Sequence, residues 1–412
     1  MIHVKDEIQS NPYIRSKLGF SYFIYQLNDA VANNTSIASL LNQTFIHAWI
    51  SYPSWQLNSD IFQYLNADDI SLLQSKQATF ILDATFEGFS TIYHVPFFDI
   101  LHYNCTKYNI DPSQVIFVSS NLYDEKNYAN WLQGKNFNHL NVLSLNAYGD
   151  PHGSSVPSTW HNFIKDNSGY NLWIDYIKSQ VTSNFSNKFY SNCSRRNRFH
   201  RSKFVFMLSK SKAYNYGLIS HNASSIEEIT PLWFFLSNTE YNEDDVNQWL
   251  KTLPLVIDRP DFEVQWASDP AYSKIYDKTL FSITNETYQD DFYQTSMFFS
   301  EKTFRPIMCA QPFLINGAPY SHRHLEMLGY KLYHQHFDYS FDTELDMTTR
   351  FKKIIKVAED TCQYLSSMTQ KQQIAWRFQC EDILIHNLQV FYTNQYNKQK
   401  ICSFLNTVSN RQ

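Results

Sequence analysis

The sequence is poor in glycine, proline and charged residues, which excludes several classes of protein. Of its 412 residues, 9 are Gly and 13 are Pro, and charged side chains make up 18%. Collagen-like chains need far more Gly and Pro, and disordered chains are more polar. No apolar stretch approaches the ~20 residues of a membrane span, and the first residues lack the basic-then-apolar order of a secretion signal. We therefore predict a globular protein without a membrane span, located in the cytoplasm, or in the host cytoplasm if the source is viral.

Familiar catalytic and metal-binding signatures are also missing. The six cysteines are scattered without a CxxC spacing, so the sequence predicts neither a zinc site nor a disulfide framework. It has no GxGxxG, GxxxxGK[ST], HExxH or GxSxG motif, which disfavours dinucleotide oxidoreductases, P-loop enzymes, zincins and α/β-hydrolases. A net charge of -5 provides no global field for a polyanion. Aromatic residues, by contrast, make up 17% of the chain, and we expect most of them in the core, although Tyr and Trp rings also stack on sugars and bases.

Both halves of the sequence contain short apolar strands that alternate with helices. In the first half, strands are predicted at 80–83, 115–118 and 140–145, with a helix from 97 to 108 between the first two. The second half repeats this alternation. Continuous apolar strands of this kind are typical of a parallel sheet covered on both faces. We therefore predict an α/β protein of two Rossmann-like, doubly wound lobes that face each other across a cleft. The first lobe is expected over residues 1–185 and the second lobe over residues 186–412.

A basic cluster lies immediately before a predicted helix in the second half. Residues 195–201 contain four arginines and one histidine, of which we select Arg195, Arg198, His200 and Arg201. Guanidinium groups and the free N–H groups of a helix N-terminus both favour anions. The cluster is thus a candidate site for a diphosphate, and the alternative is a solvated basic loop.

A second polar cluster opens another predicted helix. Ser300 is a suitable N-cap, and Glu301, Lys302 and Thr303 follow it in the first turn. Glu301 could accept hydrogen bonds from ribose hydroxyls while Lys302 neutralises phosphate; the alternative is an ordinary helix start. Glu286 follows a predicted strand, where parallel sheets present ligand-binding side chains, and it is the carboxylate best placed near such a donor.

A sugar transfer that inverts the anomeric carbon requires a base to take the proton of the acceptor hydroxyl. Glu87 follows a predicted strand and is our first candidate, with Asp83, His94 and His102 behind it. The competing interpretation of Glu87 is a capping role in a turn beside Gly88. No Asp-x-Asp motif follows a convincing buried strand. We therefore predict no metal, with cationic side chains replacing its charge on the leaving diphosphate.

Several short motifs run in order along the chain. In the second half they are residues 195–201, residues 217–220, Asn285-Glu-Thr287, Ser300-Glu-Lys-Thr303 with Pro306, Gln311-Pro-Phe313 with Gly317, Gly329-Tyr330, Asp338-Tyr-Ser-Phe-Asp342 and Arg350. In the first half they are Glu87-Gly88, Leu101-His102, residues 115–119 with Asn121, and Asn127-Tyr128 with Trp131. Together they resemble a family of bacterial and viral glycosyltransferases whose C-terminal signature is similar to that of the α-1,3-fucosyltransferases. The chain departs from the family in having Ser300 where Thr is common, and in lacking one carboxylate of the motif that ends at Asp342.

The resemblance implies a GT-B fold whose first lobe, residues 1–185, lies on the acceptor side and whose second lobe, residues 186–412, holds a nucleotide sugar. It also implies that Glu301, Lys302 and residues 195–201 lie against ribose and diphosphate. We therefore expect a metal-independent, inverting glycosyltransferase that uses a nucleotide sugar as co-substrate and no other cofactor. The acceptor is a glycan or, especially for a viral protein, a hydroxymethylated base in DNA. The alternative is a non-catalytic nucleotide- or glycan-binding protein on the same fold. The sequence does not indicate an oligomeric state.

Overall fold

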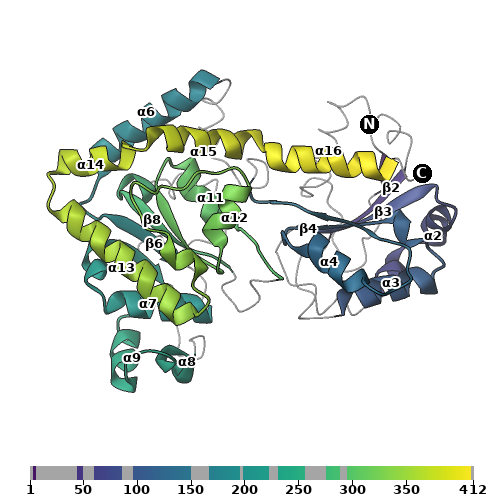
Figure 1. The fold of residues 1–412 in the computed structure, drawn as a ribbon, viewed down its shortest axis with the longest axis horizontal. Helices are drawn as coiled ribbons and strands as arrows, with labels where there is room; N and C mark the ends of the chain where they lie inside the picture. Colours follow the sequence, from purple (N-terminus) through teal and green to yellow (C-terminus); the bar gives the residue numbers. More distant parts are fainter. Residues whose placement is uncertain are drawn as a thin grey trace. The chain divides into compact units, whose positions relative to one another are not determined.

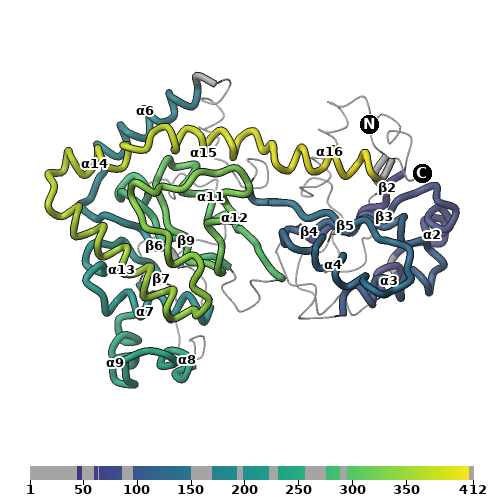
Figure 2. Tube along the Cα trace, viewed as in Figure 1, coloured from purple at the N-terminus to yellow at the C-terminus, as the bar shows by residue number. Residues whose placement is uncertain are grey.

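The computed structural model divides the chain into two compact units, each with a parallel sheet (Figure 1). Unit 1 comprises Met1–Gly153, Phe292–Phe299 and Asn394–Gln412, and unit 2 comprises Ser154–Asp291 and Ser300–Thr393. Figure 2 follows the chain from unit 1 into unit 2 and back through the C-terminal helix. The structure describes residues 3–5, 44–49, 60–85, 96–149, 167–194, 198–221, 231–255, 275–287 and 295–409.

Five parallel strands form the described sheet of unit 1, and they lie side by side in chain order. Strands β3 and β4 are buried along their whole length, as expected for central strands of a parallel sheet. The strands are β1 (His3–Lys5), β2 (Thr44–Trp49), β3 (Ala78–Ala84), β4 (Val115–Ser119) and β5 (Asn141–Ser144). The helices between them are η3 (Ile61–Tyr64), α2 (Ala67–Gln74), α3 (Phe97–Lys107), η4 (Pro112–Gln114) and α4 (Asp124–Leu132).

The two faces of this sheet are covered in different ways. Leu82 and its neighbours pack against α2, α3 and α4. Ile81, on the opposite face, belongs to a cluster with Ile401 and Leu405 of α16 (Gln395–Ser409). Right-handed crossovers between strands in chain order place all connecting helices on one face, so the other face requires cover from elsewhere in the sequence. The C-terminal helix provides part of that cover.

Unit 2 contains a four-stranded parallel sheet in which the chain order reverses. Its strands lie in the order β7-β6-β8-β9, so the chain moves outward from β6 to β7 and then returns past β6 to β8. Contacts pair α7 with α13 and join α11 to α15 and α15 to α6, so helices form two layers around the sheet (Figure 1). The strands are β6 (Tyr190–Ser194), β7 (Gly217–His221), β8 (Phe281–Asn285) and β9 (Phe313–Asn316). The helices are α6 (Asn167–Asn184), α7 (Phe199–Ser209), η5 (Lys212–Tyr216), α8 (Leu232–Leu236), α9 (Glu243–Leu250), α11 (Glu301–Met308), α12 (Ser321–Met327), η7 (Ser340–Thr343), α13 (Met347–Ser366), α14 (Gln370–Phe378) and α15 (Glu381–Thr393).

The prediction of an α/β protein with two parallel sheets is confirmed, but three details differ. The division falls after Gly153 and not after residue 185, because α6 packs in unit 2, and α16 belongs to unit 1. The reversal of a doubly wound sheet occurs in unit 2 and not among the described strands of unit 1. Strand β6 occupies a polar stretch in which the pattern of apolar strands predicts no strand, and its Ser191 and Asn192 side chains are hydrogen-bonded across the sheet, as between Ser191 and Ser282 at 3.0 Å.

Candidate functional site

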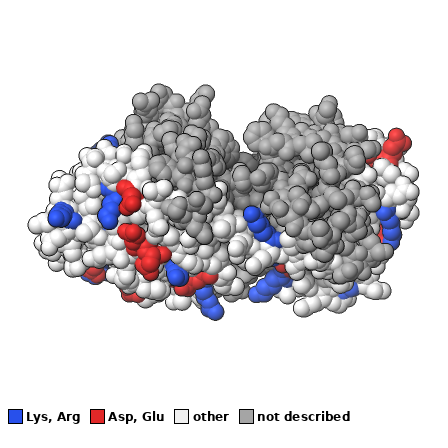
Figure 3. Space-filling view, turned by 90° about the horizontal axis from the view of Figure 1, so that it is seen from above, with Lys and Arg blue, Asp and Glu red and all other residues white. Residues whose placement is uncertain are grey.

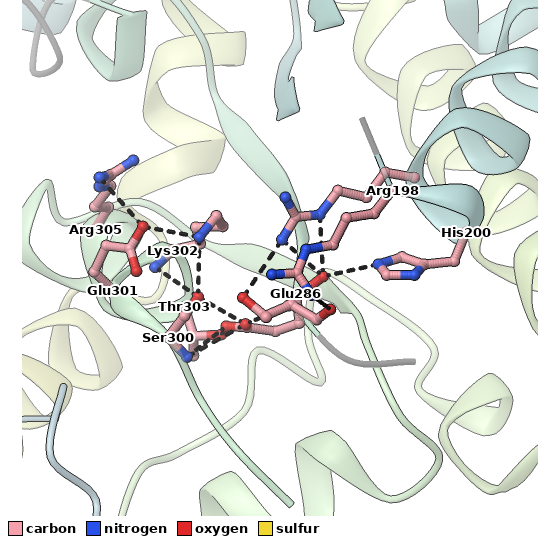
Figure 4. A network of polar contacts seen from close by, with 10 residues as sticks. Arg198, His200, Glu286, Ser300, Glu301, Lys302, Thr303 and Arg305 are labelled. Carbon is pink, nitrogen blue, oxygen red and sulfur yellow. Dashed lines mark hydrogen bonds and ion pairs between the residues drawn. The ribbon is translucent and has the colours of Figure 1, made fainter. Parts of the chain in front are cut away.

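The candidate site lies at the carboxyl ends of β6 and β8, where the strand order of unit 2 reverses. Open parallel sheets bind ligands at such a point, because the connections after the two strands run to opposite faces and leave a crevice. Three groups of residues from the sequence prediction meet there (Figure 4). Arg198, His200 and Arg201 open α7 after β6, Glu286 follows β8, and residues 300–303 open α11.

The side chain of Glu286 joins the end of β8 to the start of α11, and the residue is 1% exposed. Its carboxylate accepts hydrogen bonds from the backbone N–H of Thr287 at 2.9 Å, from the backbone N–H of Ser300 at 3.2 Å and from the Ser300 hydroxyl at 2.7 Å. The Thr303 hydroxyl is a further donor. An ionised carboxylate offers about four acceptor positions, so these donors satisfy it. The geometry gives Glu286 a positioning role instead of the direct donor contact that its place after β8 predicts.

The backbone carbonyl of Glu286 fixes the start of α7 in a similar way. It accepts hydrogen bonds from Nε2 of His200 at 3.2 Å and from Nε and Nη2 of Arg201 at 3.2 and 3.1 Å. Arg198 reaches the neighbouring carbonyl of Thr287 at 3.3 Å. The residue at the end of β8 therefore orients side chains from two helices.

Burial removes the charge of His200. Burial, reinforced by Arg201, lowers the pKa of His200 to about 3, although its hydrogen bond to Glu286 raises the pKa. The imidazole is neutral at pH 7, and its Nε2–H donates to the Glu286 carbonyl. His200 thus supports the site through this hydrogen bond and supplies no positive charge for the predicted diphosphate.

Lys302 and Glu301 form a partly buried ion pair in the first turn of α11. Nζ of Lys302 lies 2.8 Å from Oε1 of Glu301, and Nη2 of Arg305 lies 3.5 Å from the same oxygen. Burial alone would raise the pKa of Glu301, but Lys302 and Arg305 lower it to about 2. Burial also lowers the pKa of Lys302. At neutral pH Glu301 is therefore an ionised acceptor whose side chain is 19% exposed, beside a lysine that is 25% exposed.

These side chains can hold an anion that carries hydroxyl groups. Burial lowers the pKa of Lys302; the carboxylates of Glu301 and Glu286 raise this pKa, whereas Arg201 and Arg305 lower it. Three cationic side chains from α7 and α11 are therefore close together, and Arg201 is buried among them. Both helices also direct their N-terminal ends, which favour anions, toward this edge of the sheet. The partly exposed Lys302 can exchange Glu301 for a phosphate oxygen, and Glu301 can then accept a hydrogen bond from a hydroxyl. A sugar or nucleoside phosphate combines these two features.

A row of buried asparagines supports the site from within the sheet. Nδ2 of Asn316 in β9 donates to Oδ1 of Asn285 in β8 at 2.7 Å, and Nδ2 of Asn285 donates to Oδ1 of Asn192 in β6 at 2.9 Å. Gly317 comes next, where an added Cβ would lie 3.4 Å from Cβ of Glu286 and only 2.9 Å from Oγ of Ser321. The close approach of Ser321, together with Ile315 at 3.0 Å, explains why this position holds glycine.

The motif that ends at Asp342 has a structural role that the sequence did not reveal. Its carboxylate accepts hydrogen bonds from the backbone N–H of His322 at 2.9 Å and of Arg323 at 3.1 Å, and it pairs with Nδ1 of His322 at 2.9 Å. Nε2 of His322 accepts from the backbone N–H of Ile315 in β9 at 3.0 Å. Asp342 therefore anchors α12 to the end of β9. His322 and Asp342 lie 20 residues apart in the sequence. The only sequence signal for this role is that the motif ends in a carboxylate.

Some of the predicted residues fall outside the described part of the chain. These are Arg195 and two of the candidate bases, Glu87 and His94. Among the remaining candidates, Asp83 is fully buried at the end of β3, where Oδ2 lies 3.5 Å from Nε2 of His47. His102 stacks against Trp131 with ring centroids 4.9 Å apart, which is a packing role. The assignment of Glu87 as the base stays a prediction.

Two asparagines of the first-half motifs bind the segment that precedes Ser300. Nδ2 of Asn121 and of Asn127 both donate to the carbonyl of Thr295, at 3.0 and 2.7 Å. Oδ1 of Asn121 accepts from the backbone N–H of Met297 at 3.0 Å. This segment therefore belongs to unit 1, and the first residue of the α11 cluster follows it closely.

Within the described ranges, no three His, Cys, Asp or Glu side chains are grouped so that they could hold a metal ion. Metal independence stays a prediction. Of the helices that the structure describes, none combines the length and apolar composition needed to cross a membrane. No protein-family model matches the sequence, and no curated protein matches it significantly.

Proposed function

We propose that this protein is a nucleotide-sugar-dependent glycosyltransferase of GT-B type whose donor site lies at the carboxyl ends of β6 and β8. The observation that carries the proposal is the meeting of the starts of α7 and α11 at the point of strand reversal. There Lys302, Arg201 and Arg305 concentrate positive charge beside an ionised, partly exposed Glu301. A diphosphate linked to a ribose requires cations and a hydroxyl acceptor in this combination.

In the proposed reaction the acceptor oxygen forms a bond to the anomeric carbon as the bond from that carbon to the diphosphate oxygen breaks. Lys302 and Arg201 stabilise the negative charge that develops on the leaving diphosphate. The acceptor proton passes to a base, for which Glu87 is the candidate. The carbon inverts because attack and departure occur on opposite sides.

The acceptor is a glycan or a hydroxymethylated base in DNA. Acidic and basic side chains are interspersed on the described part of the face that Figure 3 shows, so we place glycans first. DNA binding would reveal itself by an affinity that falls steeply with salt, because binding to phosphates releases counterions.

The donor site is tested by thermal stabilisation with UDP-, GDP-, dTDP-, CMP- and ADP-sugars and their free nucleotides. A ligand at 100 times its Kd adds about 2.7 kcal/mol to the free energy of unfolding. We expect one nucleotide to stabilise the protein, and we expect Lys302→Ala to abolish the shift and to reduce turnover about 100-fold or more. Lys356→Ala is the matched control, since that lysine lies on α13 and is 67% exposed.

The outcomes separate the alternatives. The proposed donor site is wrong if no nucleotide stabilises the protein. It is also wrong if a nucleotide stabilises Lys302→Ala as much as it stabilises Lys356→Ala. Selective stabilisation without release of free nucleotide in any acceptor mixture would instead indicate a non-catalytic nucleotide-binding protein.

A further inference from the structure

Three aromatic side chains gather beside the start of α7, and two of them are largely exposed. Phe199 is 54% exposed and Trp233 of α8 is 68% exposed. Phe234 lies between them, with its ring centroid 5.9 Å from that of Phe199 and 5.7 Å from that of Trp233. A cluster of large exposed apolar side chains on a globular protein generally marks a binding surface. We refer to Phe199, Trp233 and Phe234 as the aromatic platform.

The aromatic platform adjoins the candidate donor site. Phe199 directly follows Arg198, whose guanidinium contacts the carbonyl of Thr287 at the end of β8. Phe199 of the platform and Arg201 of the candidate site therefore lie in the same first turn of α7, at the strand reversal. A diphosphate bound at the partly exposed Lys302, with the buried Arg201 behind it, would have its nucleoside near this turn.

Contacts behind the platform hold it in place. Nζ of Lys203, one turn along α7 from Phe199, donates to the carbonyl and the hydroxyl of Ser237 at 2.6 and 2.9 Å, which ties α8 to α7. The same ammonium lies 5.2 Å from the ring centre of Phe234. On the buried side, Phe206 and Phe235 pack edge to face with centroids 5.5 Å apart. The exposed rings are thus presented on a fixed base, which reduces the entropy lost when a flat ligand stacks on them.

We infer that the aromatic platform binds the base of the nucleotide-sugar donor by stacking. This inference rests on the proposed function and identifies the part of unit 2 that recognises the nucleoside. A nucleobase suits the platform because it is flat, uncharged and joined through ribose to a diphosphate, for which the neighbouring cations provide the complementary charge. Stacking of a base on an aromatic side chain accepts any base, so the platform supplies affinity and leaves the choice between bases to hydrogen bonds.

The test compares two ligands that share the diphosphate group and differ in the nucleoside. Isothermal titration measures the affinity of the nucleoside diphosphate preferred in the stability panel and of inorganic pyrophosphate. We expect Trp233→Ala and Phe199→Ala each to lower the affinity for the nucleoside diphosphate about 5- to 100-fold. Both should leave the affinity for pyrophosphate unchanged. Trp233→Phe should retain most of the affinity, because it keeps a ring for stacking.

Two controls make the result specific. Tyr364→Ala removes an aromatic side chain that is 56% exposed on α13, and it should change neither affinity. Lys302→Ala should lower the affinity for both ligands. If Lys302→Ala weakens both ligands while the platform variants bind the nucleoside diphosphate as the wild type does, the donor site stands and the platform inference is wrong. If the wild-type protein binds neither ligand, the proposed function fails and the platform inference fails with it.

Discussion

The two sheets follow the same rules of parallel pairing, but among the described strands the chain order reverses in only one of them. In unit 1 the described strands follow one another in chain order, and the helices between them cover one face. In unit 2 the order reverses between β6 and β8, and helices lie in two layers. A reversal sends successive connections to opposite faces, which opens a crevice at the carboxyl ends of two neighbouring strands. The charged residues of the candidate site gather at that point.

The comparison also shows what each arrangement requires elsewhere. The sheet of unit 1 needs cover on its second face, and α16 supplies part of it from the end of the chain. In unit 2 the candidate site lies at the carboxyl end of the sheet, and the buried Arg377 joins the segments before β8 and β9 at the amino end.

The amino end of the unit 2 sheet depends on the buried Arg377. Its guanidinium donates to the carbonyls of Tyr276 and Thr279, just before β8, at 2.6 and 2.8 Å, and to those of Cys309 and Ala310, before β9, at 2.6 and 3.1 Å. Arg377→Met would leave these acceptors with fewer donors in a site closed to water. Hydrogen bonds to charged groups are worth about 1.5–3 kcal/mol each, so we expect the free energy of unfolding in urea to fall by about 4 kcal/mol or more.

Arg323→Met provides the control for this substitution. Arg323 lies on α12 and is exposed, so the same change should alter stability by less than about 0.5 kcal/mol. A loss at Arg377 no greater than the loss at Arg323 would show that the amino end of the sheet does not need the buried guanidinium.

The cover on unit 1 is tested by Ile401→Ala in α16. Ile401 is fully buried in the cluster that contains Ile81 of β3, and truncation of a buried isoleucine to alanine generally costs about 2–5 kcal/mol. We expect a loss of about 3 kcal/mol, together with faster hydrogen exchange in β3 and β4. Gln399→Ala, at an exposed position of the same helix, should have little effect. Equal losses from the two substitutions would contradict the role of α16 as a cover for the sheet.

Much of the fold could be predicted where burial and sequence pattern agree. Strands β3 and β4 are continuous apolar runs, and burial on both faces of a parallel sheet selects such sequences. Strand β6 could not be predicted in this way, because Ser191 and Asn192 are buried through hydrogen bonds to residues about ninety positions away. The place of α16 in unit 1 likewise depends on contacts far along the chain.

In the candidate site, too, features set by neighbouring residues could be predicted and features set by distant contacts could not. The start of α11 could be predicted because Ser300 caps its own helix, through a hydrogen bond from the backbone N–H of Lys302 at 3.4 Å. The positioning role of Glu286 could not, since its donors Ser300 and Thr303 lie 14 and 17 residues further on. Tertiary contacts decide that the Glu286 carboxylate is enclosed by protein donors while the Glu301 side chain stays 19% exposed, and the pattern of residue types is the same for both.

One buried titratable group in each unit is expected to make stability depend on pH. The two dependences have opposite signs, and both effects are smaller than those of the substitutions above. In unit 1, burial and the nearby Lys135 lower the pKa of His102 to about 4 from an ordinary value of 6.5. Between those values the unfolded chain binds a proton that the folded unit does not, so stability rises with pH. In unit 2, burial raises the pKa of Asp277 to about 6 from 3.8, although Arg377 lowers it. There the folded unit binds the extra proton, so stability falls as pH rises from about 4 to about 6.

Each group contributes a slope of about 1.4 kcal/mol for each pH unit within its window. The stability of Asp277→Asn relative to wild type should therefore be lowest near pH 4. This relative stability should increase as the pH rises from about 4 to about 6. His102→Phe keeps a ring beside Trp131. Its stability relative to wild type should change in the opposite direction and decrease as the pH rises from 4 to 6.5. Urea unfolding of both variants at pH 4, 5, 6 and 7 measures these differences. A constant difference for Asp277→Asn across this range would mean that its carboxyl group ionises in unit 2 as it does in water, and that its environment at the closed end of the sheet is more polar than its burial indicates.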